Sequence, residues 1–202
     1  GTGVLVMNLL AAGPKPRETV PIFPLATVLY PGMRLPLKIF EQRYLEMIKQ
    51  AIADNTPFGI CAIREGAETG TPATPYSVGT RVHITDWDML QTGILHIDTQ
   101  AQERFVIRSI LTEPSGLLIG EVEAVSAESA IAVPADLELA VEILRHIIDE
   151  YGEAHFPPPH DFGNAVWVGY RLSELLPLKL GIRQNLLEMN DSITRLNILT
   201  EF

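Results

Sequence analysis

Residues 21–48 read PIFPLATVLYPGMRLPLKIFEQRYLEMI, and this stretch decides the fold that we expect. Two short apolar runs flank the pair Pro31-Gly32. Proline presets φ at the first central position of a turn and glycine accepts a positive φ at the second, so the pair predicts a type II turn. Beyond Lys38 the apolar spacing becomes helical, which predicts an amphipathic helix. Its apolar face consists of Phe40, Tyr44, Met47, Ile48, Ala51 and Ile52. A strand, turn, strand and helix in this order can begin a small barrel.

The rest of the chain divides into parts of different pattern. Residues 1–19 form an arm, residues 20–125 are mostly strand-like, residues 126–135 are a linker of small residues, and residues 136–202 are helical. In the strand-like part, β-rich runs separated by turn residues predict a meander or barrel. These runs cover residues 58–63, 78–87, 93–99, 104–111 and 117–125.

The helical part begins with the most regular apolar period in the chain, at residues 136–151. A continuous stripe of this kind predicts either packing into a core or a helix that binds a partner, and Gly152 is well placed to end the helix. A second helix is expected at residues 164–176, and two shorter ones follow, the last capped by Asp191 or Ser192. The stripe consists of Leu137, Ala140, Val141, Leu144, Ile147, Ile148 and Tyr151.

Composition excludes several classes of partner. The 202 residues are 47% hydrophobic and 20% charged, which is typical of a folded globular protein. The formal net charge is −10 and no basic stripe is present, so we expect neither a nucleic acid nor an anionic membrane as a partner. A transmembrane helix needs about twenty consecutive apolar residues, and the sequence has no such run.

The single cysteine and the N-terminal run bear on the compartment. Cys61 is the only cysteine, so no intrachain disulfide is possible, and its apolar neighbours predict a buried strand position. The apolar run Val4–Ala12 has no positively charged start, and its uninterrupted apolar stretches are short, so a secretory signal is not expected. The sequence therefore favours the cytoplasm.

A histidine-rich segment is the one candidate metal site. His155, His160 and Asp161, with His146 on the preceding helix, are residue types that bind zinc. Three prolines between the two histidines favour an extended loop, whereas zinc ligands must converge to about 2 Å from the ion. We therefore interpret the segment as a polar connector and expect no cofactor.

Other polar residues read as ordinary sheet positions. His83 and His96 fall in strand patterns, and Asp86 and Asp88 flank a tryptophan on one strand face, which favours a solvated hairpin end over paired catalytic carboxylates. No P-loop motif is present, and none of the four lysines lies in a recognisable peptidase motif.

The Pro31-Gly32 turn is the candidate binding site. Apolar side chains in a reversal are exposed unless another element covers them, and an uncovered apolar patch marks an interaction site. The candidate contacts are Val28, Leu29, Tyr30 and Met33, and the helical part of the chain is the element that could cover them instead. The polar loop at residues 66–77 is a second place where recognition could occur.

Several motifs in order along the chain resemble the N-terminal substrate-binding domain of the Lon protease family. In the first half they are Phe23-Pro24-Leu25, Tyr30-Pro31-Gly32-Met33, Leu35-Pro36-Leu37, Phe40-Glu41-x-Arg43-Tyr44 and Val78-Gly79-Thr80. Glu103-Arg104-Phe105 resembles the family's Gly-x-x-Arg-Phe hairpin, with Ala101 at the usual glycine position. Near the end, residues 172–178 and 184–188 resemble the family's helical extension.

The resemblance covers roughly residues 20–200 and carries expectations of its own. It implies an α+β protein with a PUA-like, mostly antiparallel β-barrel and an inserted helix, followed by a C-terminal α-helical bundle. The family's ATPase and Ser–Lys peptidase segments are absent from these 202 residues. We therefore expect a non-catalytic module that binds proteins or unfolded polypeptide segments, or docks onto a protease or chaperone.

Two alternatives come from other functional classes. PUA-like barrels include RNA readers, but the net charge of −10 and the lack of interleaved aromatic and basic residues argue against RNA. A metal-assisted hydrolase would require that His155, His160 and Asp161 converge on one ion.

Overall fold

The Pro31-Gly32 pair forms the reversal that the sequence predicts. In the computed structural model, which describes residues 16–202, Gly32 has a φ of +85° and the amide of Met33 donates to the carbonyl of Tyr30 at 2.9 Å. The predicted order of strand, turn, strand and helix around this turn is confirmed. The arm expected at residues 1–19 is shorter than predicted, because the first strand already begins at Arg17. The apolar run Val4–Ala12 lies outside the described residues.

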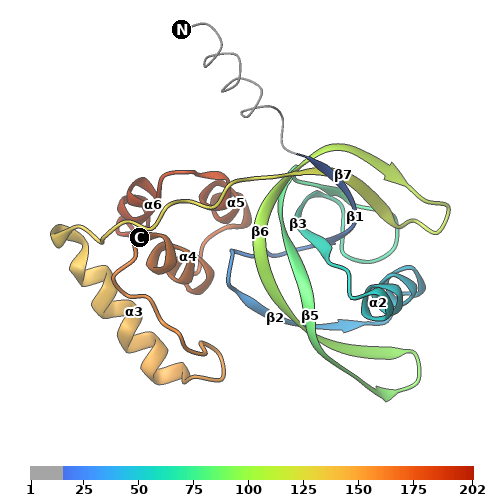
Figure 1. The fold of residues 1–202 in the computed structure, drawn as a ribbon, viewed down its shortest axis with the longest axis horizontal. Coiled ribbons are helices and arrows are strands. Elements are labelled where there is room, and N and C mark those ends of the chain that lie inside the picture. The colour runs from blue at the N-terminus through green and yellow to red at the C-terminus, as the bar shows by residue number, and fades with distance from the viewer. Residues whose placement is uncertain (1–15) are drawn as a thin grey trace, which may run out of the picture.

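The strands form one mostly antiparallel sheet, seen on the right of Figure 1. Neighbours follow the order β1-β7-β6-β5-β3-β4, and β2 pairs with β6. β1 also pairs with β3 in parallel, so the path of paired neighbours returns to its start. The strands are β1 (Arg17–Leu25), β2 (Arg34–Ile39), β3 (Phe58–Glu65), β4 (Thr74–Pro75), β5 (Val78–Gln91), β6 (Ile94–Thr112) and β7 (Leu118–Ala124).

One long strand replaces a predicted hairpin. The sequence separates residues 93–99 from 104–111, whereas the structure has the continuous strand β6, and Ala101 lies inside it. The prediction is wrong because distant segments bond the backbone at the expected turn: the Ala101 amide donates to the Met33 carbonyl at 2.8 Å, and the Ala101 carbonyl accepts from the Gly32 amide at 3.0 Å. β6 therefore pairs with β5, with β2 in its first half and with β7 in its second half.

The helices begin and end where local chemistry predicts. Gly152 follows α3 with a φ of +83°, Asn164 caps α4 by accepting from the Val166 amide, and Asp191 caps α6 by accepting from the amides of Ile193 and Thr194. The helices are α2 (Gln42–Asp54), α3 (Glu138–Tyr151), α4 (Ala165–Leu175), α5 (Leu180–Glu188) and α6 (Ser192–Leu199), with a 3-10 turn, η1 (Ala135–Leu137), before α3. Within residues 16–202 no helix is both long and apolar enough to cross a bilayer.

The predicted apolar faces are mostly buried, with exceptions at their ends. The exposed fraction of Phe40 is 56%, because Phe40 precedes α2 instead of lying within it, and that of Tyr151 is 58% at the last position of α3. Inside the sheet lies an apolar cluster that we call the strand core. It includes Phe23, Leu29, Tyr44, Leu45, Ile48, Phe58, Ile60, Val82, Leu95 and Ile97.

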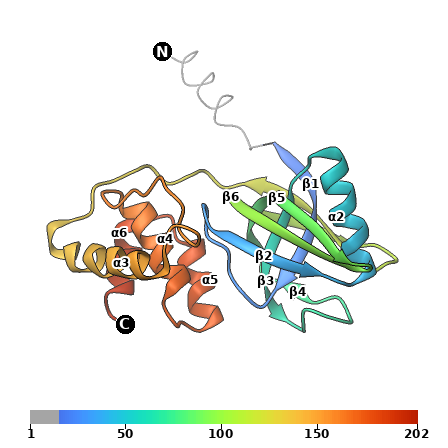
Figure 2. The same ribbon diagram turned by 90° about the horizontal axis from the view of Figure 1, so that it is seen from below.

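A second apolar cluster lies among the helices, which are on the left of Figure 2. α3, α4, α5 and α6 supply most of it, and the strand side contributes Val28, Tyr30 and Ala62. The linker predicted at residues 126–135 packs onto these helices: the Ala165 amide donates to the Ile131 carbonyl at 2.8 Å, and the Val133 amide to the Gly163 carbonyl at 3.2 Å.

Two buried arginines bind the last carbonyls of α5, a place that we call the helix–sheet junction. Arg104 on β6 donates to the carbonyls of Leu187 and Met189, both at 2.9 Å. Arg195 on α6 donates to the carbonyl of Leu186 at 2.9 Å and that of Met189 at 2.7 Å. The last carbonyls of a helix lack partners within it and carry partial negative charge, so two cations satisfy them well.

The linker completes the junction through Glu128. Its Oε2 accepts from Arg195 Nη2 at 2.9 Å and from the Tyr170 hydroxyl at 2.8 Å, and its side chain is 6% exposed. The guanidinium carbon of Arg195 also lies 4.3 Å from the centre of the Tyr170 ring. The linker, α4 and α6 are thus held by one buried polar cluster.

Candidate binding surface

The apolar turn is mostly buried. Of the two outcomes that the sequence allowed, an exposed patch or a turn covered by the helical part, the structure shows the second. Val28 and Leu29 are each 2% exposed and Tyr30 is 0% exposed. As direct contacts to a partner these three residues were wrongly predicted, because the helices cover Val28 and Tyr30 while Leu29 enters the strand core. Of the four candidates only Met33 is partly exposed and lines a pocket.

Tyr30 shows how the turn is fixed to the helices. Its ring stacks on that of Tyr170 with centres 5.7 Å apart, and its hydroxyl donates to the Arg183 carbonyl at 2.9 Å. Burial raises the pKa of Tyr30 well above its usual range, so the hydroxyl stays a donor. The Thr80 hydroxyl donates to the Leu29 carbonyl at 2.7 Å and holds the preceding backbone on the sheet.

Arg171 joins the turn to α4. Its Nη2 donates to the Pro31 carbonyl at 2.7 Å, and its Nε lies 3.0 Å from Oε2 of Glu174. The second contact is an ion pair without hydrogen-bond geometry. Burial lowers the pKa of Arg171 and raises that of Glu174, while the attraction between the two opposes both shifts.

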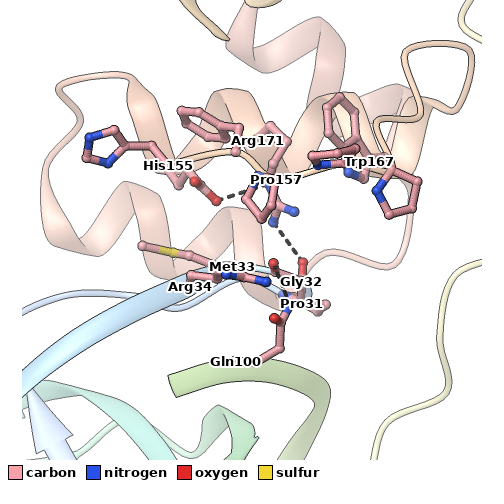
Figure 3. A pocket seen from close by; sticks show the side chains of 13 residues that line it. Pro31, Gly32, Met33, Arg34, Gln100, His155, Pro157, Trp167 and Arg171 are labelled. Carbon is pink, nitrogen blue, oxygen red and sulfur yellow. Dashed lines mark hydrogen bonds and ion pairs between the residues drawn. The ribbon is translucent and has the colours of Figure 1, made fainter. Parts of the chain in front are cut away.

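A pocket of about 320 Å³, which we call the seam pocket, opens between this turn and the helices. Figure 3 shows the turn on one side and Arg171, Trp167 and Pro157 on the other. Its wall combines polar and apolar groups, and the proline segment is stiff because prolines have little conformational freedom to lose on binding. The lining residues are Pro31, Gly32, Met33, Arg34, Gln100, His155, Phe156, Pro157, Pro158, Pro159, Trp167, Arg171 and Glu174.

A second pocket of about 390 Å³ adjoins the first, and we call it the linker pocket. Pro31 and Trp167 line both pockets. The linker pocket lies over the helix–sheet junction, with Arg104, Glu128 and Tyr170 in its wall. The two pockets therefore form neighbouring hollows along the boundary between the sheet and α4.

Two further pockets lie away from this boundary. One, of about 210 Å³, lies beside α2 and is lined by Phe23, Leu37, exposed Phe40 and Glu68 of the polar loop. The Glu68 carboxylate accepts from the Ala26 amide at 3.0 Å, so that loop is partly fixed. The other, of about 220 Å³, lies between α3 and the C-terminal residues.

The candidate metal ligands do not gather. His160 Nε2 lies 2.6 Å from the Phe156 carbonyl, Asp161 accepts from the Asn164 side chain, and exposed His155 packs edge-on to the Tyr151 ring. His146 pairs with Glu150 on α3. In the part of the chain that the structure describes, no three His, Cys, Asp or Glu side chains are arranged to hold a metal ion.

The remaining polar candidates occupy sheet positions. Asp86 and Asp88 are exposed on β5 opposite Asp98 and His96 of β6, and the Asp86 carboxylate accepts from the Trp87 amide. Cys61 is fully buried in β3, and burial raises the pKa of its thiol far above the usual range, which leaves it a poor nucleophile.

Sequence reasoning missed Trp167, Arg171 and Glu174. The apolar period of α4 predicts only which of its residues are buried, and it gives no information about the neighbouring face. Trp167 and Arg171 are four residues apart and so share that face, where the guanidinium carbon lies 6.0 Å from the indole centre. An aromatic residue followed four positions later by arginine was the available signal.

Comparisons with known proteins agree with this geometry. Residues 19–202 match the family model described as the ATP-dependent protease La (LON) substrate-binding domain. A Lon N-terminal domain protein from Xanthomonas campestris has a similar structure, with 31% identity, a TM-score of 0.77 and coverage of 92% of this chain and 98% of that one. The N-terminal domain of a Mycobacterium avium complex Lon protease, at 17% identity, shares the fold with a TM-score of 0.64, over 91% and 97% of the two chains.

Among curated relatives, the Lon protease of Buchnera aphidicola is 23% identical over 192 residues, covering 91% of this chain and 24% of that protein. The Lon protease of Dictyoglomus thermophilum is 31% identical over 99 residues, covering 48% of this chain and 12% of the relative. The chain thus spans about a quarter or less of the length of these two relatives.

Proposed function

This chain belongs to the Lon substrate-binding domain family, and from that premise we propose that it is a non-catalytic module that binds exposed or unfolded polypeptide segments. Its partner is a client polypeptide, or a protease or chaperone that handles one. The observation that carries the proposal is the pair of adjoining pockets that meet at Pro31 and Trp167.

The chemistry of these pockets suits a polypeptide. Trp167 offers a large apolar surface, Met33 is flexible enough to adapt to different side chains, and the proline segment is already ordered before binding. Hydrogen-bonding groups of Gln100 and Arg34 lie at the wall for contacts with a peptide backbone. Aromatic residues and arginine are the types that most often dominate binding energy at interfaces.

The proposal also includes a division of the chain into two subdomains. We infer that the ring of paired strands at residues 20–125 is a PUA-like barrel and that residues 136–202 act as a helical bundle, joined by the linker at residues 126–135. The seam pocket would then lie between two packed subdomains, a usual place for a ligand groove. We also propose a cytoplasmic location, and we expect no nucleic acid among its partners because the net charge is −10.

The two tryptophans allow a direct test. Trp167 lines both pockets, whereas Trp87 is 53% exposed on β5 away from them. The variant W87F retains Trp167, and W167F retains Trp87. We expect a tryptophan-free polypeptide, kept unfolded by reduction and alkylation, to change the emission of W87F with saturation and to leave that of W167F unchanged.

A matched pair of methionine variants measures the contribution of the surface. Met33→Asp places a charge at the seam pocket, and Met89→Asp does so at a residue 40% exposed on the distant end of β5. We expect Met33→Asp to weaken binding at least about tenfold and Met89→Asp to leave it unchanged. The proposal is wrong if the unfolded polypeptide does not bind, or if only Trp87 and Met89 respond to it.

A further inference from the structure

The seam pocket differs in charge from the other three pockets described above. Its charged lining residues are Arg34 and Arg171 against Glu174, an excess of one cation. The linker pocket has Arg104 against Glu103 and Glu128. The pockets beside α2 and α3 also carry more acidic than basic residues. The chain has a net charge of −10, so an acidic ligand group would be attracted more strongly to the seam pocket than to the other three pockets.

Arg171 is built to hold such a group. The residue is 5% exposed, and its guanidinium is fixed by the Pro31 carbonyl and by Glu174. Its Nη1 has no hydrogen-bond partner among residues 16–202 and lies beside Gly32, where an added Cβ would come within 2.8 Å of it. The absence of a side chain at Gly32 therefore leaves Nη1 uncovered at the pocket wall (Figure 3).

The environment strengthens a bond from this nitrogen. A charge-assisted hydrogen bond is roughly twice as strong as a neutral one, and a partly buried site screens it less than water does. Because Arg171 is held in place before binding, little side-chain entropy is lost. Arg34, at the start of β2, is exposed and supplies a second cation at the mouth.

We propose that the seam pocket binds the C-terminal carboxylate of a client polypeptide, with Arg171 Nη1 and the Arg34 guanidinium as its partners and with Met33, Pro157 and Trp167 against the last side chain. The inference rests on the proposed function and names the part of the client that the pocket receives. A chain end carries the carboxylate and a side chain on one residue, which suits a pocket with cations beside an apolar wall. An internal acidic residue has chain on both sides, so two flanking segments of the client would have to fit between the turn and the proline segment.

Three matched peptides test the inference. All have the same apolar sequence and an N-terminal fluorophore; one ends in a free carboxylate, one in an amide, and one in an amide with an internal glutamate that restores the charge. Binding is followed by fluorescence anisotropy at low and moderate salt. We expect the free acid to bind at least about tenfold more tightly than either amide, with an advantage that shrinks as salt screens the exposed Arg34.

A pair of arginine variants locates the effect. Arg34→Gln should reduce the preference for the acid over the amide several-fold, while Arg64→Gln, an exposed arginine at the end of β3, should preserve it. Arg34 makes no hydrogen bond or ion pair with a side chain among the described residues, so its replacement leaves the fold intact.

The outcomes separate this inference from the proposed function. Equal binding of acid and amide overturns the inference and leaves the proposed function standing. Tight binding of the internal-glutamate amide also overturns it, because the source would then be a side chain. Failure of all three peptides and of the unfolded polypeptide would refute the proposed function itself.

Discussion

The strand core and the helix–sheet junction are packed by different chemistry. In the strand core, apolar side chains such as Phe58, Ile60 and Leu45 fill the interior, and buried threonines bond nearby carbonyls. At the junction, Arg104 and Arg195 reach the last carbonyls of α5, and Glu128 balances Arg195. Apolar packing is non-directional, whereas arginine bonds have fixed directions. The first makes a stable interior, and the second specifies where the helices lie.

The proposed binding surface uses both kinds of packing. The turn at Pro31 lies between the two regions: Leu29 enters the strand core while Tyr30 enters the second apolar cluster, among the helices. Arg171 continues the use of arginine on backbone carbonyls at the turn itself. The seam pocket can thus be formed only while the directional bonds hold the helices against the sheet.

The largest effect is expected from Arg195→Met. The substitution keeps an apolar chain in place of the aliphatic part of arginine but leaves Glu128 buried without its cation, and breaking a buried ion pair costs about 3–5 kcal/mol. Ile60→Val, which removes one methyl group from the strand core, should cost about 0.5–1.5 kcal/mol. Urea unfolding followed by circular dichroism measures both free energies.

The double variant Arg195→Met with Glu128→Gln is the control for this difference. Removing the stranded carboxylate should restore part of the lost free energy of unfolding, because the two residues are directly coupled. If Arg195→Met costs no more than Ile60→Val, directional bonds at the junction contribute no more than apolar packing and the comparison fails.

An intermediate effect is expected at the turn. Gly32→Ala and Gly93→Ala each place alanine at a φ near +85°, which costs about 1–2 kcal/mol. At Gly93 the new Cβ meets open space, whereas at Gly32 it displaces Arg171 from the Pro31 carbonyl. Losing that charged hydrogen bond should add about 1.5–3 kcal/mol for Gly32→Ala. Thermal unfolding of the two variants gives the difference, and equal destabilisation would show that Arg171 does not fasten the turn.

The smallest effect concerns the cap of α6, which depends on its sequence neighbours alone. Bonds from the backbone amides of Thr194 and Ile193 lower the pKa of exposed Asp191 below its usual value. A lowered pKa stabilises the folded protein above the unfolded-state value of about 3.9, and this contribution is lost as pH falls through the folded-state value. Asp191→Asn still caps the helix but does not titrate.

The measurement for this cap is urea unfolding in steps from neutral pH into the acid range. Wild-type stability should fall more steeply than that of Asp191→Asn once the pH drops below about 4. Parallel curves would mean that the aspartate is not the titrating cap.

Local features of the fold followed from the sequence. The turn at Pro31-Gly32, the end of α3 at Gly152 and the cap at Asp191 each depend on residues within one turn of the chain, and all three were predicted correctly. Apolar periods located the helices for the same reason, since a face is defined by spacing along one element. Family motifs over most of the chain indicated the fold as a whole.

Features that depend on residues far apart in the chain could not be predicted from the sequence. Ala101 continues β6 because Gly32 and Met33 bond its backbone, and no local residue encodes those bonds. The exposure of Val28 and Tyr30 was wrongly predicted in the same way: both are apolar residues in a turn, and only the helices more than a hundred residues later decide that they are covered.

The sequence by itself therefore determined the helices, the turns and caps set by neighbouring residues, and the family to which the chain belongs. The tertiary structure alone decided which surface is open, because Trp167 and Arg171 become part of a pocket only when α4 lies against the Pro31 turn. The physical reason is that turns, caps and amphipathic faces are encoded by neighbouring residues, whereas burial and arginine-to-carbonyl bonds depend on groups far apart in the chain.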